Sequence, residues 1–291
     1  MNGTESHRAA TTVSARHDSL KLRVLTALTY PIFYTLNRPA LSRLNNAFYD
    51  FALRCNGIAI NFKGGHGLSV GEENFLKRHL KPDGTGVLLD VGANSGMYTL
   101  FMHSLAPNAR IFSFEPHPKT FKLLQGNATL PNVTLVNEAM GATSGTMMLF
   151  DIAADDGSTQ ASLSRDAVAL FSTDVVEHPT RCTTLDEFIK DQGIDAITLL
   201  KIDTEGYDLN VLKGAAQAIA ERRIYAIQFE FIPANIATHV SMRDFFDVLP
   251  GYDLYRQCMN GDLLPLPHYD VKRCEIYVTH NIVALLRQRP G

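Results

Sequence analysis

Polar and acidic side chains recur along this chain, each group directly after a run of apolar residues. The groups are Asp90-Val-Gly92-Ala-Asn94-Ser-Gly96, Glu115-Pro116, Asn137-Glu138, Lys201-Ile-Asp203-Thr-Glu205-Gly206 and Glu230. Carboxylates and amides can bind the hydroxyl and amino groups of a small ligand through hydrogen bonds. A carboxylate can also take a proton from a reacting group. One such group alone indicates little, whereas their repetition after successive runs predicts one shared site.

The first group predicts a tight turn between a strand and a helix. Gly92 permits the turn, and Gly96 lets the start of the helix approach a ligand closely. The spacing departs from G-x-G-x-x-G, and Asp90 precedes the first glycine by two residues. Backbone N–H groups at a helix start suit a diphosphate, but this carboxylate would repel it. A ligand with an amino group and a sulfonium would not be repelled. A plain turn without a ligand is the alternative.

An acid also follows the second apolar run. Glu115 lies twenty-five residues after Asp90. A carboxylate at this place can bind two ribose hydroxyls through charge-assisted hydrogen bonds. Alternatively, Glu115 is a solvated acid at a strand end or near the start of a helix at Pro118. Together the first two groups favour a nucleoside ligand.

The elements that must position these groups alternate between strands and helices. Strands are predicted over 87–94, 109–116, 133–140, 145–152, 196–203, 223–231, 252–259 and 274–285. Helices are predicted over 70–80, 97–105, 118–128, 182–191, 208–220 and 241–249. This alternation predicts an α/β fold with a mostly parallel sheet covered on both faces. Ligands bind such sheets outside the carboxyl ends of the strands.

Four motifs in this order resemble the FkbM family of S-adenosylmethionine-dependent methyltransferases. They are DVGANSG (90–96), FEP (114–116), TLDEF (184–188) and LLKIDTEGYDLNVLKGA (199–215), and the resemblance covers roughly residues 65–285. It implies a class I Rossmann-like methyltransferase fold with a seven-stranded, mostly parallel sheet whose last strand is antiparallel. It also implies S-adenosylmethionine as cofactor and methyl transfer to a hydroxyl, usually of a sugar or natural product.

The resemblance also assigns cofactor-binding residues by position. Asp90, Gly92, Asn94 and Gly96 would form the cofactor loop, and Glu115 would hold the ribose. Asn137 and Glu138 lie where such enzymes contact the adenine end.

Two positions depart from the family pattern. The family often has Gly-Asp after the third strand, where this chain has Gly141-Ala142, so adenine contacts there stay open. The family often has EGAE after the fourth strand, where this chain has Glu205-Gly-Tyr207-Asp208. The second acid is thus an aspartate, preceded by a bulky tyrosine.

The group after the fourth parallel strand contains the predicted catalytic residues. Alternation places Lys201 and Asp203 on the same side of the strand. Asp203 could be the general base, kept ionised by Lys201, while Glu205 orients the amino end of the cofactor or the acceptor. Alternatively, Lys201 and Glu205 form a structural ion pair and Asp203 caps the next helix. The sequence leaves both open.

Histidines are weaker candidates for the base. His66 lies in a glycine-rich segment and His117 follows the Glu115 motif, whereas His178 and His239 fall in predicted loops. Each is interpreted as a bystander, with His66 kept as a minor catalytic candidate. Asp203 and Glu205 could bind a metal with Glu230, but no H-x-x-x-H or paired Asp-Asp motif accompanies them, so no metal is predicted.

Beyond the sheet, the chain is predicted to have an N-terminal helical extension. We expect a disordered tail at residues 1–18, the extension at 19–80 and the methyltransferase domain at 81–291, with a loop or lid at 153–180. Loops often determine specificity, so the irregular parts, residues 153–180 and 20–70, are expected to bind the acceptor. The polar side chains of 153–180 suit a polyhydroxylated one.

The apolar segment 20–36 is too short and too charged for a transmembrane helix, which needs about 20 apolar residues. It is interpreted as a helix packed on the domain. The alternative is weak contact with a membrane surface.

Composition narrows the remaining function classes. The 291 residues hold 27 Lys and Arg against 30 Asp and Glu, which disfavours nucleic-acid binding. The four cysteines are scattered, as expected in a reducing compartment such as the cytoplasm. The altered glycine spacing disfavours an NAD-dependent oxidoreductase. An O-methyltransferase acting on a sugar hydroxyl of a glycan, glycolipid or glycosylated natural product is the main hypothesis. An N-methyltransferase of a small metabolite and a non-catalytic nucleoside-binding module are the alternatives, and the oligomeric state stays open.

Overall fold

Residues 20–80 and 84–287 are described by the computed structural model, in which the chain divides into two compact units, 1–52 and 53–291. Helix α1 (Leu20–Leu36), the 3-10 helix η1 (Pro39–Leu41) and most of α2 (Ser42–Cys55) lie in the first unit. The side-chain amide of Asn45 donates a hydrogen bond to the carbonyl of Leu36 at 2.9 Å, across the turn between α1 and α2. No helix in the described ranges is long and apolar enough to span a bilayer. The predicted tail, 1–18, lies outside these ranges.

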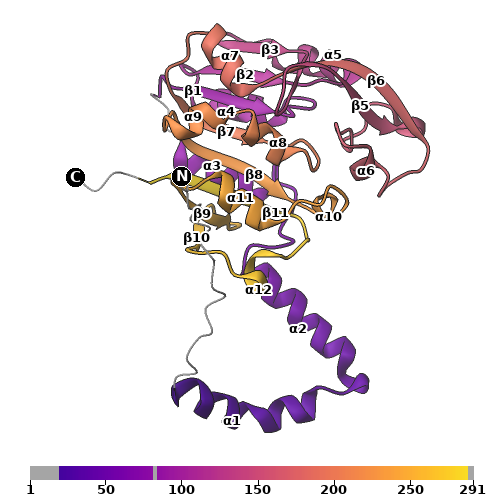
Figure 1. Ribbon diagram of the computed structural model, residues 1–291, viewed down its shortest axis with the longest axis vertical. Helices are drawn as coiled ribbons and strands as arrows, with labels where there is room; N and C mark the ends of the chain where they lie inside the picture. The colour runs from indigo at the N-terminus through magenta and orange to yellow at the C-terminus, as the bar shows by residue number, and fades with distance from the viewer. Residues whose placement is uncertain (1–19, 81–83, 288–291) are drawn as a thin grey trace, which may run out of the picture. The chain divides into compact units, whose positions relative to one another are not determined.

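The second unit is built on an eight-stranded sheet with the order β10-β9-β11-β8-β7-β1-β2-β3 (Figure 1). Its strands are β1 (Val87–Val91), β2 (Arg110–Phe114), β3 (Val133–Val136), β7 (Ile197–Ile202), β8 (Ile224–Phe231), β9 (Tyr252–Gln257), β10 (Leu263–Leu266) and β11 (His280–Leu286). The neighbouring strands β8-β7-β1-β2-β3 are parallel, and β11 is antiparallel to both β8 and β9. This confirms the predicted sheet with its antiparallel last strand. Strand β10, which was not predicted, adds an eighth strand at one edge.

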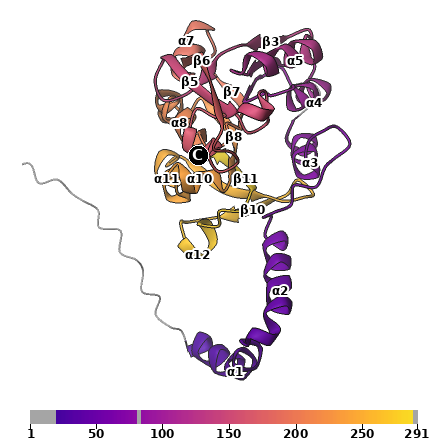
Figure 2. The same ribbon diagram turned by 90° about the vertical axis from the view of Figure 1, so that its right-hand side faces the viewer.

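Helices cover both faces of this sheet (Figure 2). One face packs against α3 (Val70–His79), α4 (Met97–Leu105) and α5 (Pro118–Ala128). The other packs against α7 (Leu185–Asp191), α8 (Asp208–Lys213), α9 (Ala216–Ala220) and α11 (Met242–Val248). Two short helices, α10 (Ala234–Ala237) and α12 (Val271–Cys274), follow β8 and β10. Helix α3, grouped by sequence with the extension, lies in the second unit.

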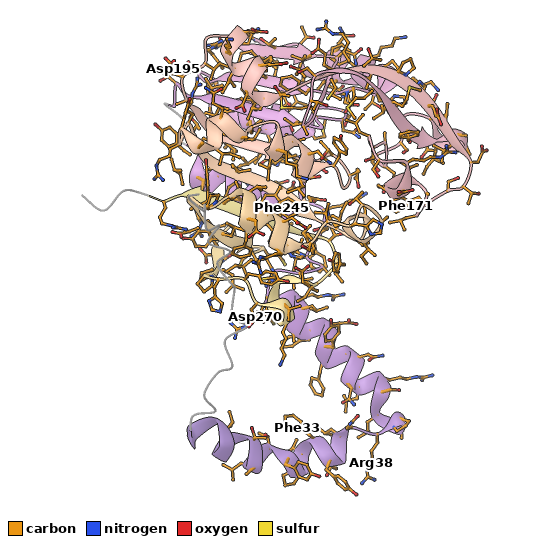
Figure 3. The ribbon with its side chains drawn as sticks, viewed as in Figure 1. Phe33, Arg38, Phe171, Asp195, Phe245 and Asp270 are labelled. Atoms are coloured by element: carbon orange, nitrogen blue, oxygen red, sulfur yellow. The ribbon has the colours of Figure 1, made fainter. Side chains whose placement is uncertain are left out.

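Alternation along the strands explains why these residues form a buried sheet. In β1, Leu88 packs into the core on the α3 and α4 face, whereas Leu89 packs into the opposite core. On that opposite face, Phe245 of α11 stacks on Phe229 of β8 with ring centroids 4.3 Å apart (Figure 3). Apolar residues on both faces are typical of parallel strands.

A second, three-stranded sheet has the order β4-β6-β5. Strand β5 (Gly145–Ile152) pairs antiparallel along its length with β6 (Val175–Thr183), and β4 (Ala139–Met140) adds at the far edge of β6. The start of β6 was predicted to be irregular, and this was wrong: its polar residues are ordered by pairing with a strand more than twenty residues earlier. The 3-10 helix η2 (Ala153–Asp155) and helix α6 (Arg165–Val168) lie between these two strands. We call residues 153–164 the cover segment.

Two further differences from the predicted elements have local causes. The helix predicted over 208–220 is divided into α8 and α9 near Gly214, where a Cβ atom would lie 2.0 Å from the carbonyl oxygen of Gly141. The helix therefore breaks where two backbones meet. The strand predicted over 274–285 begins only at His280, because α12 precedes it.

Candidate functional site

A cavity of about 320 Å³ lies at the carboxyl ends of the parallel strands. It forms where the strand order reverses, since β1 lies between β2 and β7 although the chain passes through β3 to β6 before reaching β7. Open α/β sheets bind ligands at this point. The loops after β1, β2 and β7, the start of α3 and the cover segment all line the cavity.

The loop after β1 has the backbone shape that its glycines predicted. Gly92, Asn94 and Gly96 all have positive φ angles, of 82°, 49° and 90°. A Cβ atom on Gly92 would lie 1.8 Å from the carbonyl oxygen of Asp203, so only glycine lets the loops after β1 and β7 approach each other. Gly92 and Asn94 line the cavity, whereas Gly96 caps α4 behind it.

Asp90 lies beneath the cavity and not in its lining. The side chain is fully buried within β1, where it accepts a hydrogen bond from Thr99 at 2.7 Å and lies 3.8 Å from the Lys201 ammonium. Burial raises the pKa of Asp90, opposed by Lys201 and Thr99. Asp90 therefore contacts Thr99 and Lys201 and does not face the cavity.

Glu115, in contrast, lines the cavity at the end of β2. Its carboxylate oxygens accept hydrogen bonds from the backbone N–H groups of Asn94 at 2.9 Å and His117 at 2.8 Å. The residue is only 6% exposed, and burial raises its pKa to about 7 despite these two bonds. A carboxylate has about four acceptor sites, so two hydroxyl groups could complete its hydrogen bonding. These remaining acceptor sites fit the two hydroxyl donors of a ribose.

The two polar residues after β3 have different positions. Glu138 lines the cavity and forms an ion pair with Arg181 at 3.2 Å. Asn137 lies outside the lining, and its side-chain amide donates to the carbonyls of Glu115 at 2.8 Å and Pro116 at 3.2 Å. Asn137 therefore braces the turn after β2.

The end of β7 contains the predicted pair of opposite charges. The ammonium of Lys201 lies 2.8 Å from Asp203 and 5.1 Å from the centre of the Tyr98 ring. Burial opposes the charge of Lys201, but the carboxylates of Asp203 and Asp90 outweigh it and raise its pKa. The alternative pairing of Lys201 with Glu205 is not seen, and Tyr207, not Asp203, is the N-cap of α8.

Glu205 stands out among the acids that line the cavity. Its backbone has a positive φ of 50°, which is rare for residues other than glycine and often marks a functional site. Burial, followed by the charges of Asp203 and Asp208, raises its pKa to about 8. Nearby Glu230, outside the lining, has a pKa raised well above its usual value by burial and then by the charges of Asp203, Glu205 and Glu72.

Sequence reasoning missed two polar lining residues, Glu72 at the start of α3 and Tyr98 of α4. Ser69, Ser158 and Ser162, which also line the cavity, lie within the regions predicted to bind the acceptor. The helix predicted over 70–80 does begin at Val70, where Ser69 and Glu72 form a capping box, but no local signal shows that this start faces the cavity.

Of the histidines, His66 lies outside the lining, with Nδ1 3.2 Å from Glu73 and its ring against Phe101. The structure gives it no catalytic position. His117 and His178 both lie against Asp156. The three residues are far apart in the sequence, so no local pattern could have predicted this contact.

The topology, with an acid at the end of the second strand and a glycine turn after the first, defines a class I Rossmann-like methyltransferase. A family model described as the methyltransferase FkbM domain matches residues 90–257. The chain therefore belongs to the FkbM methyltransferase family, whose methyl donor is S-adenosylmethionine.

Three curated relatives are similar over parts of their length. The 2-O-methyltransferase NoeI of Sinorhizobium fredii is 24% identical over 62% of this chain and 77% of its own. The 31-O-demethyl-FK506 methyltransferase FkbM of Streptomyces tacrolimicus is 28% identical over 52% and 72%. The hexuronic acid methyltransferase AglP of Haloferax volcanii is 27% identical over 51% and 58%. A crystal structure of an O-methyltransferase from Bacillus cereus with S-adenosylhomocysteine matches 90% of this chain and 99% of that one, with a TM-score of 0.40 and 13% identity.

Proposed function

We propose that this protein transfers a methyl group from S-adenosylmethionine to a hydroxyl oxygen of a sugar-bearing acceptor. The observation that carries the proposal is one cavity that joins Glu115, suited to a ribose, with Glu205, suited to take a proton. The relatives NoeI and FkbM, named as O-methyltransferases, support oxygen as the acceptor atom. The relative named for hexuronic acid supports a sugar.

Glu115 and the loop after β1 would hold the donor. Glu115 is nearly buried and ionises reluctantly, so two ribose hydroxyls would supply the donors that its carboxylate lacks. Glu138 lies on the same side of the sheet, after β3, where an adenine end would extend. When bound, S-adenosylmethionine supplies an electrophilic methyl group on a sulfonium. The protein then mainly holds the acceptor oxygen in position for in-line attack.

Glu205 is the proton acceptor in this proposal. Its carboxylate lines the cavity, and no hydrogen bond to it is found among the described residues. A pKa of about 8 lies close to neutral pH, and a base whose pKa is near the pH of the reaction is the most efficient general base. Asp203 is instead held by Lys201 at 2.8 Å, so its negative charge is partly compensated.

The first test is the chemistry of the product. Purified protein is incubated with methyl-labelled S-adenosylmethionine and a panel of methyl glycosides that carry hydroxyl, amino or carboxyl groups. We expect an alkali-stable methyl ether, identified by mass spectrometry, because the acceptor atom is a hydroxyl oxygen. An N-methylated amino sugar as the sole product would contradict O-methylation, and no binding of S-adenosylhomocysteine in calorimetry would contradict donor binding altogether.

We further propose that the N-terminal helices contact an anionic membrane surface. Residues 20–55 hold five Lys and Arg against one acidic residue, Asp50, although the whole chain is acidic. On α2, Leu44, Phe48 and Phe51 lie at the i, i+4, i+7 spacing of one apolar stripe and are all exposed. Helix α1 has exposed apolar side chains on several sides, including Phe33, with Arg38 just after its end (Figure 3). Basic and apolar groups together suit anionic lipid.

Vesicle co-sedimentation of the full chain tests this contact. We expect binding to vesicles with phosphatidylglycerol and much weaker binding to pure phosphatidylcholine, because the basic charge contributes to the attraction. The change Phe33→Asp should weaken binding severalfold, whereas Leu123→Asp, on an equally exposed leucine of α5, should not. Equal loss with both variants, or dissociation of a dimer by Phe33→Asp in sedimentation velocity, would overturn the proposal.

A further inference from the structure

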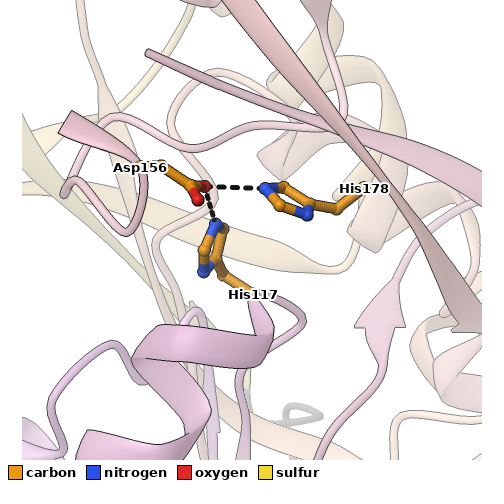
Figure 4. Close-up of side chains that lie close together, drawn as sticks. All are labelled: His117, Asp156 and His178. Carbon is orange, nitrogen blue, oxygen red and sulfur yellow. Dashed lines mark hydrogen bonds and ion pairs between the residues drawn. The ribbon is translucent and has the colours of Figure 1, made fainter. Parts of the chain in front are cut away.

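Three titratable side chains without a role in the proposed chemistry meet close to Glu115. They are His117 at the start of α5, Asp156 in the cover segment and His178 in β6 (Figure 4). The Nε2 atoms of His117 and His178 lie 2.9 Å and 2.7 Å from the same carboxylate oxygen of Asp156. The His117 ring is almost fully buried, and the other two side chains are about one-fifth exposed. Two separate elements, α5 and β6, therefore meet at one carboxylate of the cover segment.

The carboxylate of Asp156 is ionised in this arrangement. Its second oxygen pairs with the ammonium of Lys119. The bond from Lys119, followed by those from the two histidines, holds the pKa of Asp156 well below its usual range. A buried acid of β5, Asp151, faces the same His117 nitrogen at 3.5 Å. The charged and titratable groups around the cluster thus come from α5, β5, β6 and the cover segment.

The hydrogen bonds of His117 indicate where its proton lies. Its Nδ1 accepts a hydrogen bond from the backbone N–H of Lys119 at 3.2 Å, so the neutral ring carries its proton on Nε2. That N–H donates to Asp156. The three ligand-type atoms lie within 4.8 Å of one another and could in principle hold a metal ion. A metal would need the lone pair of Nε2, however, which this tautomer does not offer.

The cluster joins the cover segment to the donor-binding residues. The backbone N–H of His117 donates to Glu115 at 2.8 Å while its side chain holds Asp156. Two residues after Asp156, Ser158 lines the cavity. Further along, Ser162 lines it too and donates to the carbonyl of Thr204 at 3.3 Å. One histidine thus connects the proposed ribose-binding acid with the segment that covers the cavity.

We propose that His117, Asp156 and His178 form a clasp that positions the cover segment over the donor-binding end of the cavity. The inference rests on the proposed function only in naming S-adenosylmethionine as the ligand that the segment covers. None of the three lines the cavity, so they are positioning residues. Without the clasp, the cover segment must become ordered when the donor binds. The free-energy cost of this ordering weakens donor binding.

The test compares two neighbouring acids. Asp156→Ala removes the clasp, whereas Asp155→Ala removes the same charge from an exposed side chain for which no hydrogen bond is found in the described residues. By calorimetry, we expect S-adenosylhomocysteine to bind about tenfold more weakly to Asp156→Ala, the scale of one lost charged hydrogen bond. Asp155→Ala should stay within about twofold of the wild type on the same scale. Hydrogen exchange of peptides covering 153–164 should be faster in Asp156→Ala only.

A second pair of variants keeps the test decisive if Asp156→Ala does not fold. His178→Gln retains an N–H donor and should behave like the wild type, whereas His178→Leu should resemble Asp156→Ala in both measurements. A structural role in folding alone would not produce this rescue at unchanged thermal stability.

The outcomes separate the clasp from the proposed function. If the wild type does not bind S-adenosylhomocysteine, the proposed function fails, and hydrogen exchange still decides on the clasp. Equal exchange of residues 153–164 in wild type and Asp156→Ala overturns the clasp. So does stoichiometric binding of Zn²⁺, titrated alone into chelator-treated protein, if His178→Gln abolishes it, because the cluster is then a metal site.

Discussion

The change Glu205→Gln is expected to lower kcat by about 10² to 10⁴, the usual contribution of a general base. The side chain keeps its size and its place in the cavity, but an amide cannot take the proton of the acceptor hydroxyl. Because the base must be ionised, kcat/KM of the wild type for the acceptor, measured at saturating donor so that Glu115 does not contribute, should rise about tenfold per pH unit below 8 and level off above it, following the raised pKa of Glu205. In Glu205→Gln this rise should be absent. Initial rates with labelled donor between pH 6 and 9.5 measure both effects.

Two other variants define how specific this result is. Asp203→Asn leaves Lys201 without its partner at 2.8 Å and should reduce the rate while the pH-dependent rise persists. Asp195→Asn, an exposed acid before β7, should have no effect on either. If Asp203→Asn removes the rise and Glu205→Gln keeps it, Asp203 is the base and the assignment of Glu205 is wrong.

The change Glu115→Gln should affect stability and donor binding in opposite directions as pH rises. The carboxyl has a pKa of about 7 when folded, against a usual value of 4.5. Between these values the folded protein retains a proton that the unfolded chain has lost, so Glu115 lowers the free energy of unfolding as pH rises toward 7. Glutamine does not ionise, so its side chain gives no such loss of stability. Between pH 5 and 8, the free energy of unfolding of the variant should therefore rise by about 2–3 kcal/mol relative to that of the wild type, measured by urea denaturation.

Binding should move the other way. Loss of the charged acceptor should make the binding free energy of S-adenosylhomocysteine about 1.5–3 kcal/mol less favourable at pH 8, because hydrogen bonds to charged groups have this strength. The 2′-deoxy analogue should lose a similar amount with the wild type and almost nothing with the variant, which assigns the effect to the ribose. Equal losses of the analogue with both proteins would show that Glu115 does not bind the 2′-hydroxyl.

The residues near the cavity show how far local pattern could predict the site. Glu115 directly follows β2 and lines the cavity as expected. Asp90 was expected to bind the cofactor too, but it lies within β1, as the predicted strand 87–94 already implied, and its side chain points toward Thr99 of α4. Alternation along a strand gives each side chain one of two faces, and the sequence alone does not show which face meets the ligand.

The sequence by itself determined the class of this protein, because its alternating elements and the order of its motifs are local properties of the chain. It also predicted that Glu115, the proposed donor-binding acid, follows a strand end, and it offered the Lys201–Asp203 pair as one of two alternatives. Only the tertiary structure decided that Glu205 has its raised pKa, since burial and charges from other residues create it. The clasp, likewise, exists only because β5 and β6 pair and bring Asp156 and His178 onto His117, three residues that no local pattern connects.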